Sequence, residues 1–383
     1  MRMSTDQQTE LLAEPKEVDV VAIERELTTL WKDVSGGATD ADSAPVVRAC
    51  ALNFIVVTED EKDVDALADM IGEVTMEHPA RIFLVVAERR SGTPKLDAWI
   101  SARCSLPVPG GKQVCCEQIN LTAHGMEANK LPSIVTSLLV SDVPGILLWK
   151  AKVDAHDSML EALAKVVSRI LIDSSEDASP EPGLLAWRTF SVAHGEHTTF
   201  GDLAWTHLTA WRSVIANAFN PQEMCAQLAN IDSIIIEYSS TTTPRHSGLS
   251  QALLLVSWLA QKLNWIVIRA FDKSVMGEYT AKLRLGEQAI NIHILPVSSR
   301  DNVPGGIESV AIHTNTNASL KFTTTQYAHC VHLSKQANAF SSEDMLTVMS
   351  DKSEALLVAQ ELEVVTRDAG YESVLNNLIN LFK

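Results

Sequence analysis

Short apolar runs rich in β-branched residues alternate with segments of helical periodicity in the first half of this chain. Residues 46–58 and 81–87 have the composition of buried strands, and residues 61–77 between them carry apolar side chains at helical spacing. Two strands joined through a helix pair in parallel, because a parallel connection needs a crossover. The pattern therefore predicts a β-α-β unit and the α/β fold class.

Further elements extend the predicted sheet of this first domain. Residues 97–105 and 113–122 are strand-like runs joined by a proline- and glycine-rich turn, which predicts an antiparallel hairpin. Helices are expected at residues 129–139 and 158–167, and strands at residues 146–150 and 169–172. The first domain should therefore contain a mixed sheet built on the β-α-β unit.

An acidic, serine-containing stretch with two prolines, residues 173–183, gives the best domain boundary in the sequence. We divide the chain into an N-terminal helix with a flexible connector (residues 1–45), an N-terminal α/β domain (46–178) and a C-terminal α/β domain (179–383). In the last, a helix at 202–219 precedes a second β-α-β unit, an antiparallel meander and C-terminal helices. The unit is expected at 233–238, 248–263 and 265–270, the meander strands at 279–285, 289–296, 309–314 and 328–333, and the helices at 353–367 and 371–382.

The net charge of the chain limits the kind of partner that it binds. Its 383 residues include 31 basic and 48 acidic side chains, a formal net charge of −17. The averaged field repels phosphate backbones and anionic membranes. No apolar run reaches about eighteen residues, and residues 1–17 are acidic and polar. We expect a cytoplasmic protein with no nucleic-acid or membrane partner.

The cysteines show no CxxC pair and no regular framework. Adjacent Cys115 and Cys116 would point to opposite faces of a strand, so no bond is expected between them. We interpret the cysteines as buried free thiols in a reducing compartment. The six are Cys50, Cys104, Cys115, Cys116, Cys225 and Cys330.

The sequence contains no residue pattern typical of an enzyme. The Gly-Gly pairs lack the spacing of a phosphate-binding loop, and no GxSxG, HExxH or kinase signature is present. His194 and His197 lack a second ligand pair at zinc-site spacing, and His329 and His332 would face opposite sides of a strand. We expect no catalytic residue, no metal and no cofactor.

Polar side chains at predicted strand ends form a candidate site for a small anion. Ser174, Ser175 and residues 241–243 follow strands, where α/β crevices place ligand-binding loops. The alternative is that these hydroxyl groups only satisfy turn backbone groups. The candidate anion-binding residues are Arg81, Arg169, Asp173 and Ser174. An enzyme acting on a phosphosugar would require basic side chains to converge on one pocket, for example Arg81, Arg169, Arg212 and Arg245.

Residues 201–212, with the sequence GDLAWTHLTAWR, begin a predicted helix. Asp202 is placed to cap it, and Arg212 lies within an apolar stripe at helical spacing that is formed by Trp205, Leu208, Ile215 and Phe219. A guanidinium on an apolar face needs a carboxylate partner, internal or on another protein. A core helix with an internal ion pair and a partner-binding interface explain this pattern equally well.

This segment resembles the DLAWTRLTPWR motif of the OpcA family, with His207 and Ala210 in place of the motif's arginine and proline. Other segments are similar to family motifs and occur in family order across about residues 46–270. They are HPAR at 78–81, CEQI at 116–119, SDVPGILLW at 141–149, RILIDS at 169–174, and LLLVSWLA followed by NW at 253–265.

The resemblance implies a non-catalytic assembly factor and allosteric activator of glucose-6-phosphate dehydrogenase in the oxidative pentose phosphate pathway. On this basis the partner-binding residues are Asp202, Trp205, Thr206, Leu208, Trp211 and Arg212. Some family members are under thiol control, and we find no cysteine pair in this sequence that would provide it. The alternative function is a lactonase-like phosphosugar enzyme of the same pathway.

Overall fold

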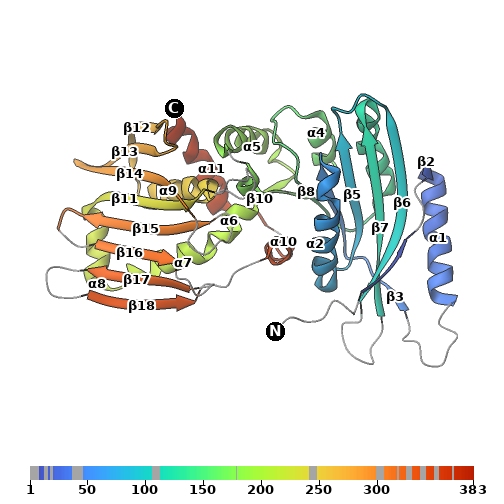
Figure 1. Cartoon of the computed structure of the whole chain (residues 1–383), viewed down its shortest axis with the longest axis horizontal. Coiled ribbons are helices and arrows are strands. Elements are labelled where there is room, and N and C mark those ends of the chain that lie inside the picture. The colour runs from blue at the N-terminus through green and yellow to red at the C-terminus, as the bar shows by residue number, and fades with distance from the viewer. Residues whose placement is uncertain are drawn as a thin grey trace.

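The chain forms two β-sheets, here called sheet A and sheet B, with helices packed on them (Figure 1). The computed structural model describes residues 8–12, 16–17, 20–36, 46–105, 113–177, 179–240, 248–298, 306–316, 319–324, 330–336, 342–348, 353–364 and 366–383. None of the helices in these ranges is long and apolar enough to span a membrane.

Sheet A has ten strands in the order β1-β6-β7-β5-β4-β8-β9-β10, with β2 paired to β6 and β3 to β7. Neighbours from β7 to β10 run parallel, and β6 is antiparallel to β7. The strands are β1 (Gln8–Leu12), β2 (Lys16–Glu17), β3 (Val46–Arg48), β4 (Leu52–Thr58), β5 (Ala80–Glu88), β6 (Lys95–Ser105), β7 (Gln113–His124), β8 (Gly145–Trp149), β9 (Arg169–Ile172) and β10 (Thr199–Asp202). The predicted mixed sheet, β-α-β unit and hairpin are therefore confirmed.

Helices cover both faces of sheet A, which explains why its central strand β4 is buried along its whole length. One face packs against α2 (Val64–Glu77) through Leu67, Ile71 and Val74. The other face packs against α1 (Val20–Gly36), α3 (Leu131–Leu138) and α4 (Ser158–Ala164). Short 3₁₀ turns lie at η1 (Glu61–Asp63), η2 (Gly125–Lys130), η3 (Ser174–Glu176) and η4 (Ala226–Asn230).

Sheet B has eight strands in the order β12-β13-β14-β11-β15-β16-β17-β18. Every neighbouring pair is antiparallel except β11 with β14. The strands are β11 (Ile231–Ser239), β12 (Ile266–Lys273), β13 (Tyr279–Leu285), β14 (Gln288–Val297), β15 (Ile307–Thr314), β16 (Ser319–Thr324), β17 (Cys330–Gln336) and β18 (Ser342–Val348). Of the predicted meander strands, β13 and β14 are antiparallel neighbours as expected. Strand β11 lies between β14 and β15, and the unpredicted β16 lies between β15 and β17, so the rest of the predicted order is wrong.

The predicted second β-α-β unit exists as a connection, but its two strands are not neighbours. Helix α9 (Leu249–Lys262) leads from β11 to β12, and β13 and β14 lie between these strands. Strand β14 takes the place beside β11 because Ile290, Ile292 and Ile294 form one fully buried face. Strand β12 lies at the edge, where Ile266 and Ile268 are exposed.

The stretch interpreted as a domain boundary, residues 173–183, includes the beginning of a helix. Helix α5 (Pro180–His194) begins at the first proline of the stretch, because proline is tolerated in the first turn. Sheet A continues beyond the expected boundary at residue 178, since β10 pairs with β9. The predicted helix at 202–219 is two helices, α6 (Leu203–His207) and α7 (Thr209–Ala218), and it is followed by α8 (Gln222–Cys225).

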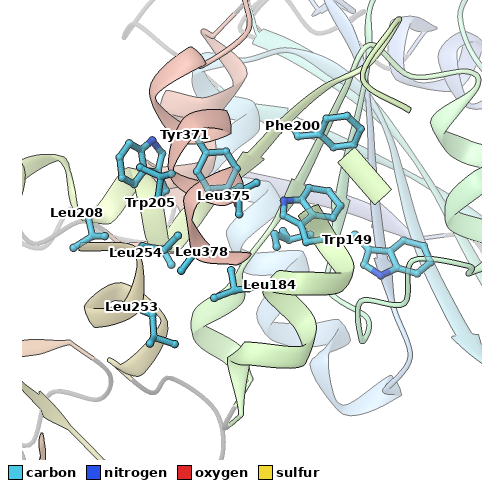
Figure 2. Packing of buried hydrophobic residues seen from close by; sticks show 14 of the residues in the cluster. Trp149, Leu184, Phe200, Trp205, Leu208, Leu253, Leu254, Tyr371, Leu375 and Leu378 are labelled. Carbon is cyan, nitrogen blue, oxygen red and sulfur yellow. The ribbon is translucent and has the colours of Figure 1, made fainter. Parts of the chain in front are cut away.

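The last two helices connect the sheets. Helix α10 (Glu354–Leu362) lies between sheets A and B and packs against α2 (Figure 1). Helix α11 (Ala369–Phe382) packs against α9 and α5. Buried aromatic and leucine side chains from α6, α9, α11, β8 and β10 form one continuous core, labelled in Figure 2 with Trp149, Phe200, Trp205 and Tyr371. The two sheets therefore share a single hydrophobic cluster.

The expectation of buried free thiols is wrong for one pair of cysteines, which is bonded, and for Cys50 and Cys225, which are free but half-buried and exposed, respectively. Cys104 on β6 and Cys115 on β7 are directly opposite in the antiparallel register and form a disulfide. Leu30 and Trp31 of α1 pack against this pair. The sequence argument compared only adjacent cysteines and CxxC spacing, whereas this bond depends on the cross-strand register of a hairpin.

We expect reduction of this disulfide to destabilise the protein. The bond closes a loop with a sequence separation of 11 residues, and loops of this size contribute about 2–3 kcal/mol. The free energy of unfolding in urea should fall by that amount when a reductant is added. The double variant Cys104→Ala/Cys115→Ala is the control, because its stability should not respond to reductant. Equal stability of the natural protein with and without reductant would contradict the prediction.

Candidate functional site

A buried carboxylate joins three segments at the carboxyl end of sheet A. Asp202 ends β10 and accepts hydrogen bonds from the backbone N–H groups of Ser174 (3.1 Å) and Ala204 (2.9 Å). It also accepts from the hydroxyl of Tyr371 on α11 (3.2 Å). Ser250 on α9 donates to the carbonyl of Ser174 and holds the same loop from the other side. Two segments that were singled out separately in the sequence, 173–174 and 202–212, are therefore neighbours.

Burial controls the protonation of this carboxyl group. Asp202 is fully buried, and desolvation raises its pKa to about 7, against the opposing effect of its hydrogen bonds from Ser174 and Ala204. Tyr371 is also completely buried, and its pKa is raised by desolvation and by the nearby charge of Asp202. The pair therefore keeps at least one shared proton between its oxygens near neutral pH.

Trp205 anchors the beginning of α11 to α6. Its indole N–H donates to the carboxylate of Asp368 at 2.8 Å, and its ring lies 5.8 Å from that of Tyr371. Asp368 also caps α11 by accepting from the backbone N–H of Tyr371. Figure 2 shows Trp205 and Tyr371 side by side above the leucines of α9 and α11.

Arg212 lies on the outer side of this tryptophan. Its guanidinium carbon is 3.4 Å from the centre of the Trp205 ring, a close cation–π contact. It donates to the hydroxyl of Thr209, and its Nε has no hydrogen-bond partner among the described residues. Desolvation lowers the pKa of Arg212 to about 10, although Asp368 opposes the shift. The half-buried cation is therefore held by an aromatic face and has no directly bonded carboxylate in the described part of the chain.

A second buried carboxylate, Glu361 of α10, reaches into the same region. It pairs with Arg169 at the start of β9 and accepts from the hydroxyl of Thr206. Gly201 leaves the room for this pair, because a Cβ there would lie 2.6 Å from Glu361 Oε2 and 2.7 Å from Leu171 Cδ2. Glu361 thus joins α10 to both β9 and α6.

The residues predicted to bind a partner lie mostly in the interior. Of the six, Arg212 alone is half-buried, and the other five are buried: Asp202, Trp205, Thr206, Leu208 and Trp211. Their contacts are those of a core helix, which was the other interpretation of the sequence pattern. A direct contact with a partner remains a prediction, and Arg212 is the residue with the accessible surface to make it.

The candidate anion-binding residues are not brought together. Arg81 and Arg169 are near the starts of β5 and β9, whereas Asp173 and Ser174 follow the end of β9, so the two pairs lie at opposite edges of the parallel strands. Arg81 is buried and bonded to Glu117 (2.7 Å), Glu24 (2.9 Å) and the carbonyl of Leu138. Both arginines are therefore occupied by internal carboxylates.

A pocket of about 410 Å³ adjoins Asp173 and Ser174 at the carboxyl edge of β8 and β9. Buried Lys150 lies at its polar end and pairs with Glu176 and Glu354 (2.6 Å). Burial lowers the pKa of Lys150, but the charges of Asp173, Glu354 and Glu176 outweigh this and raise it. Burial raises the pKa of Glu176 to about 7 despite the attraction of Lys150. Three carboxyl groups around one ammonium disfavour an anion here.

Two groups of side chains have the spacing of metal ligands, and both are internally paired. Asp173, Glu176 and Glu354 surround the ammonium of Lys150. His124 contacts Glu88 through Nδ1 (3.1 Å) and Glu61 through Nε2 (3.2 Å). An ion at the first group would have to displace the ammonium of Lys150, whereas the three side chains of the second group contact one another. Of the histidines considered from the sequence, His194 packs on Phe190 and His197 is exposed, while His329, residues 241–243 and Arg245 lie outside the described residues.

Comparisons with family models decide the family. Residues 72–189 match the model described as the glucose-6-phosphate dehydrogenase subunit N-terminal domain, and residues 198–375 match that of the C-terminal domain. The chain belongs to the OpcA family. The match to the N-terminal model ends inside α5, and the match to the C-terminal model begins directly before β10. Both elements contribute side chains to the core cluster that the sheets share.

Individual OpcA relatives are distant in sequence. A protein of Nostoc punctiforme named "Putative OxPP cycle protein OpcA" is 24% identical and aligns with 81% of this chain and 67% of its own length. The protein of the same name from Synechococcus elongatus is 25% identical over 79% of this chain and 67% of its own. The chain thus spans about two thirds of the length of these relatives.

The similar solved structures are oxidoreductases at very low identity. An NAD binding oxidoreductase from Klebsiella pneumoniae has a TM-score of 0.47 and 9% identity, over 87% of this chain and 96% of that one. Myo-inositol dehydrogenase from Lactobacillus casei, in complex with NAD(H) and myo-inositol, has a TM-score of 0.44 and 8% identity, over 85% and 91% of the chains. Likeness at this level carries no information about activity.

The three side chains that complete this site were not predicted from sequence. Glu361, Asp368 and Tyr371 are separated from residues 169–212 by the whole of sheet B. The only local signals are Asp368 directly before a helix, as expected of a cap, and a carboxylate at 361 on an apolar helix. Neither signal identifies the long-range partner.

We expect Asp202→Asn to change the pH dependence of stability. Because burial raises the pKa of Asp202 from 3.8 to about 7, the folded state holds this proton more tightly than the unfolded chain does. The resulting stabilisation is complete below about pH 4 and is lost as the pH rises through 7. Asparagine does not ionise, and its oxygen still accepts from Ser174 and Ala204.

The free energy of unfolding of the variant relative to the natural protein should therefore rise by about 2–3 kcal/mol between about pH 5 and pH 8. Urea denaturation at each pH measures this, and parallel pH profiles would refute it.

Proposed function

We propose that this chain is a non-catalytic partner of glucose-6-phosphate dehydrogenase, which assembles with the enzyme and raises its activity in the oxidative pentose phosphate pathway. The observation that carries the proposal is the match of both family models, named for a subunit of that dehydrogenase, in order along the chain. The names of the OpcA relatives, which place them in the OxPP cycle, agree with this pathway.

The ionic contacts at the carboxyl edge of sheet A support the non-catalytic part of the proposal. In α/β proteins this edge is where ligands usually bind. Here Lys150 faces Glu176 and Glu354, His124 faces Glu61 and Glu88, and Arg89 pairs with Asp157. A cation that binds an anionic substrate needs donors that are free to reach that substrate. Lys150 and Arg89 are instead paired with carboxylates of the chain, and His124 contacts two carboxylates.

The arginines also give no support to the phosphosugar enzyme considered as the alternative. Arg81 pairs with Glu117, Arg169 pairs with Glu361, and Arg212 stacks on Trp205. None of these three arginines lines the pocket beside Lys150, the groove beside β12 or the small pocket beside Arg367. A phosphate-binding site of that kind requires convergent cations.

Activation would follow from differential binding. A partner that contacts the active conformation of the dehydrogenase more strongly than the inactive one shifts the population toward the active form. Each tenfold shift requires about 1.4 kcal/mol of difference in binding free energy. A few buried aromatic or arginine side chains at an interface are sufficient for this, since such residues commonly contribute 2 kcal/mol or more each, in order of magnitude.

Adding the purified chain to the dehydrogenase of the same organism should raise its turnover or lower its apparent substrate requirement. The chain alone should convert neither glucose 6-phosphate nor the corresponding lactone. Both are measured by spectrophotometric assay of NADPH formation and lactone hydrolysis, with heat-denatured chain as the control. Turnover of either substrate by the chain alone would contradict the proposal. Unchanged activity of the dehydrogenase, together with no detectable complex at micromolar concentration, would also contradict it.

Substitutions at Trp205 and Arg212 separate the structural and the interface roles of α6 and α7. Trp205 is buried and bonded to Asp368, so Trp205→Ala should cost about 3–5 kcal/mol of stability. Arg212→Ala should cost only about 1 kcal/mol and weaken the complex with the dehydrogenase about tenfold. Arg188→Ala is the matched control, because Arg188 is also half-buried and bonded only to Asn376 in the described structure. Equal affinity of the Arg212 and Arg188 variants would remove Arg212 from the interface.

A further inference from the structure

Strand β12 is an edge of sheet B with an exposed apolar face. Among the described strands it pairs with β13 alone, so the backbone N–H and C=O groups on its other side have no strand partner there. Ile266 and Ile268 are each 53% exposed. Figure 1 shows β12 as the outermost strand of sheet B, beside α11. Exposed isoleucines on a free edge are the arrangement that natural sheets usually avoid unless the edge has a partner.

A groove of about 510 Å³ runs along this edge. One wall is the strand from Trp265 to Ala270, and the other is the last two turns of α11, with Asn377, Asn380 and Lys383. Trp265 is buried, and its indole N–H has no acceptor among the described residues. The groove thus combines apolar side chains with the amides of Asn377 and Asn380, which is a composition found in peptide-binding sites.

The sequence around this edge has more basic than acidic side chains, although Lys273 is paired with Glu181 (3.8 Å). Between positions 262 and 284 the sequence has basic side chains at 262, 269, 273, 282 and 284 and acidic ones only at 272 and 278, whereas the chain as a whole carries a net charge of −17. Arg269 is exposed, and no carboxylate of the described residues forms an ion pair with it. Lys383 adds a further cation at the groove. An acidic ligand complements this surface.

We propose that β12 binds an extended acidic segment of a partner protein by strand addition. The partner is glucose-6-phosphate dehydrogenase, an identification that rests on the function proposed above. The segment adds a strand to sheet B, with apolar side chains against Ile266 and Ile268 and carboxylates near Arg269 and Lys383. Irregular pairing of β12 with β13 after Val267 and after Arg269 interrupts the edge. The added strand is therefore short, and side-chain contacts supply much of its specificity.

A second copy of this chain fits the edge poorly. Antiparallel pairing of β12 with itself would bring the Arg269 and Lys273 cations of both copies together, and two bodies of charge −17 repel each other. An acidic segment from another protein avoids the first conflict, because its carboxylates would meet the cations of this edge. The charge argument therefore selects the partner protein.

Binding to the purified dehydrogenase tests this surface with two variants. Ile266→Asp and Ile268→Asp each replace an exposed apolar contact with a negative charge, and both positions are exposed enough for the fold to be retained, which the melting temperature checks. Each variant should weaken the complex about tenfold or more. Val275→Asp is the matched control, because Val275 is fully exposed in the turn after β12 and lies outside the groove. Its affinity should stay within about twofold of the natural chain.

The outcomes distinguish this inference from the function on which it rests. If the natural chain binds the dehydrogenase and the two isoleucine variants bind equally well, the edge is not the docking site, although the proposed function stands. If the natural chain forms no complex, both proposals fail. Light scattering measures the mass of the chain alone. A dimer that the Ile268→Asp substitution dissociates would show that β12 pairs with a second copy of the chain, and this result would overturn the proposal. Loss of affinity confined to the two groove variants supports it.

Discussion

The carboxylate of Asp202 is withdrawn from water and still has its oxygens bonded from three parts of the chain. It joins the loop after β9, the first turn of α6 and the beginning of α11, where Tyr371 lies 169 positions from Asp202. A buried carboxyl group without such partners would cost several kcal/mol. Folding of the end of sheet A therefore requires the C-terminal helix to be in place, and the two halves of the chain depend on one another.

The surroundings of Asp202 follow from this constraint. Once α11 is fixed by Tyr371, Asp368 lies where the indole N–H of Trp205 donates to it, and the tryptophan ring is then covered by Arg212. Gly201 leaves the space through which Glu361 reaches Arg169. The segment that resembles the family motif thus builds the joint between the two sheets. Its side chains are large and polar because they have partners to meet inside the protein, which is why an interface pattern and a core pattern look alike in the sequence.

Local sequence signals predicted the elements well and the pairing between distant elements poorly. The β4, α2 and β5 unit followed from periodicity, and the β6–β7 hairpin followed from two strand-like runs with a turn between them. The disulfide between Cys104 and Cys115 required the register of that hairpin, which no single position reveals. Helix α5 was hidden by Pro180 and Pro182, residues that mark a loop and also a first helical turn.

The candidate site shows the same division between local and long-range information. Asp202 was recognised as a helix cap from its position, and the cap is present. That it also binds Ser174 and Tyr371 depends on strand order and on the return of α10 and α11 across the molecule, which are set by burial of the whole core. Ion-pair partners could not be predicted from the sequence. Arg81 and Arg169 were interpreted as free cations at strand ends, but they form ion pairs with Glu117 and Glu361 from distant segments.

Helix α11 contacts both the buried Asp202 and the groove beside β12. Its first turn carries Tyr371, bonded to Asp202, and its last two turns form one wall of the groove beside β12. Between them, Leu375 and Leu378 lie in the shared core, and Ser257 of α9 donates to the carbonyl of Val374. One helix therefore contacts both the buried carboxylate of Asp202 and the groove beside β12, because burial along its length fixes its two ends relative to the same core.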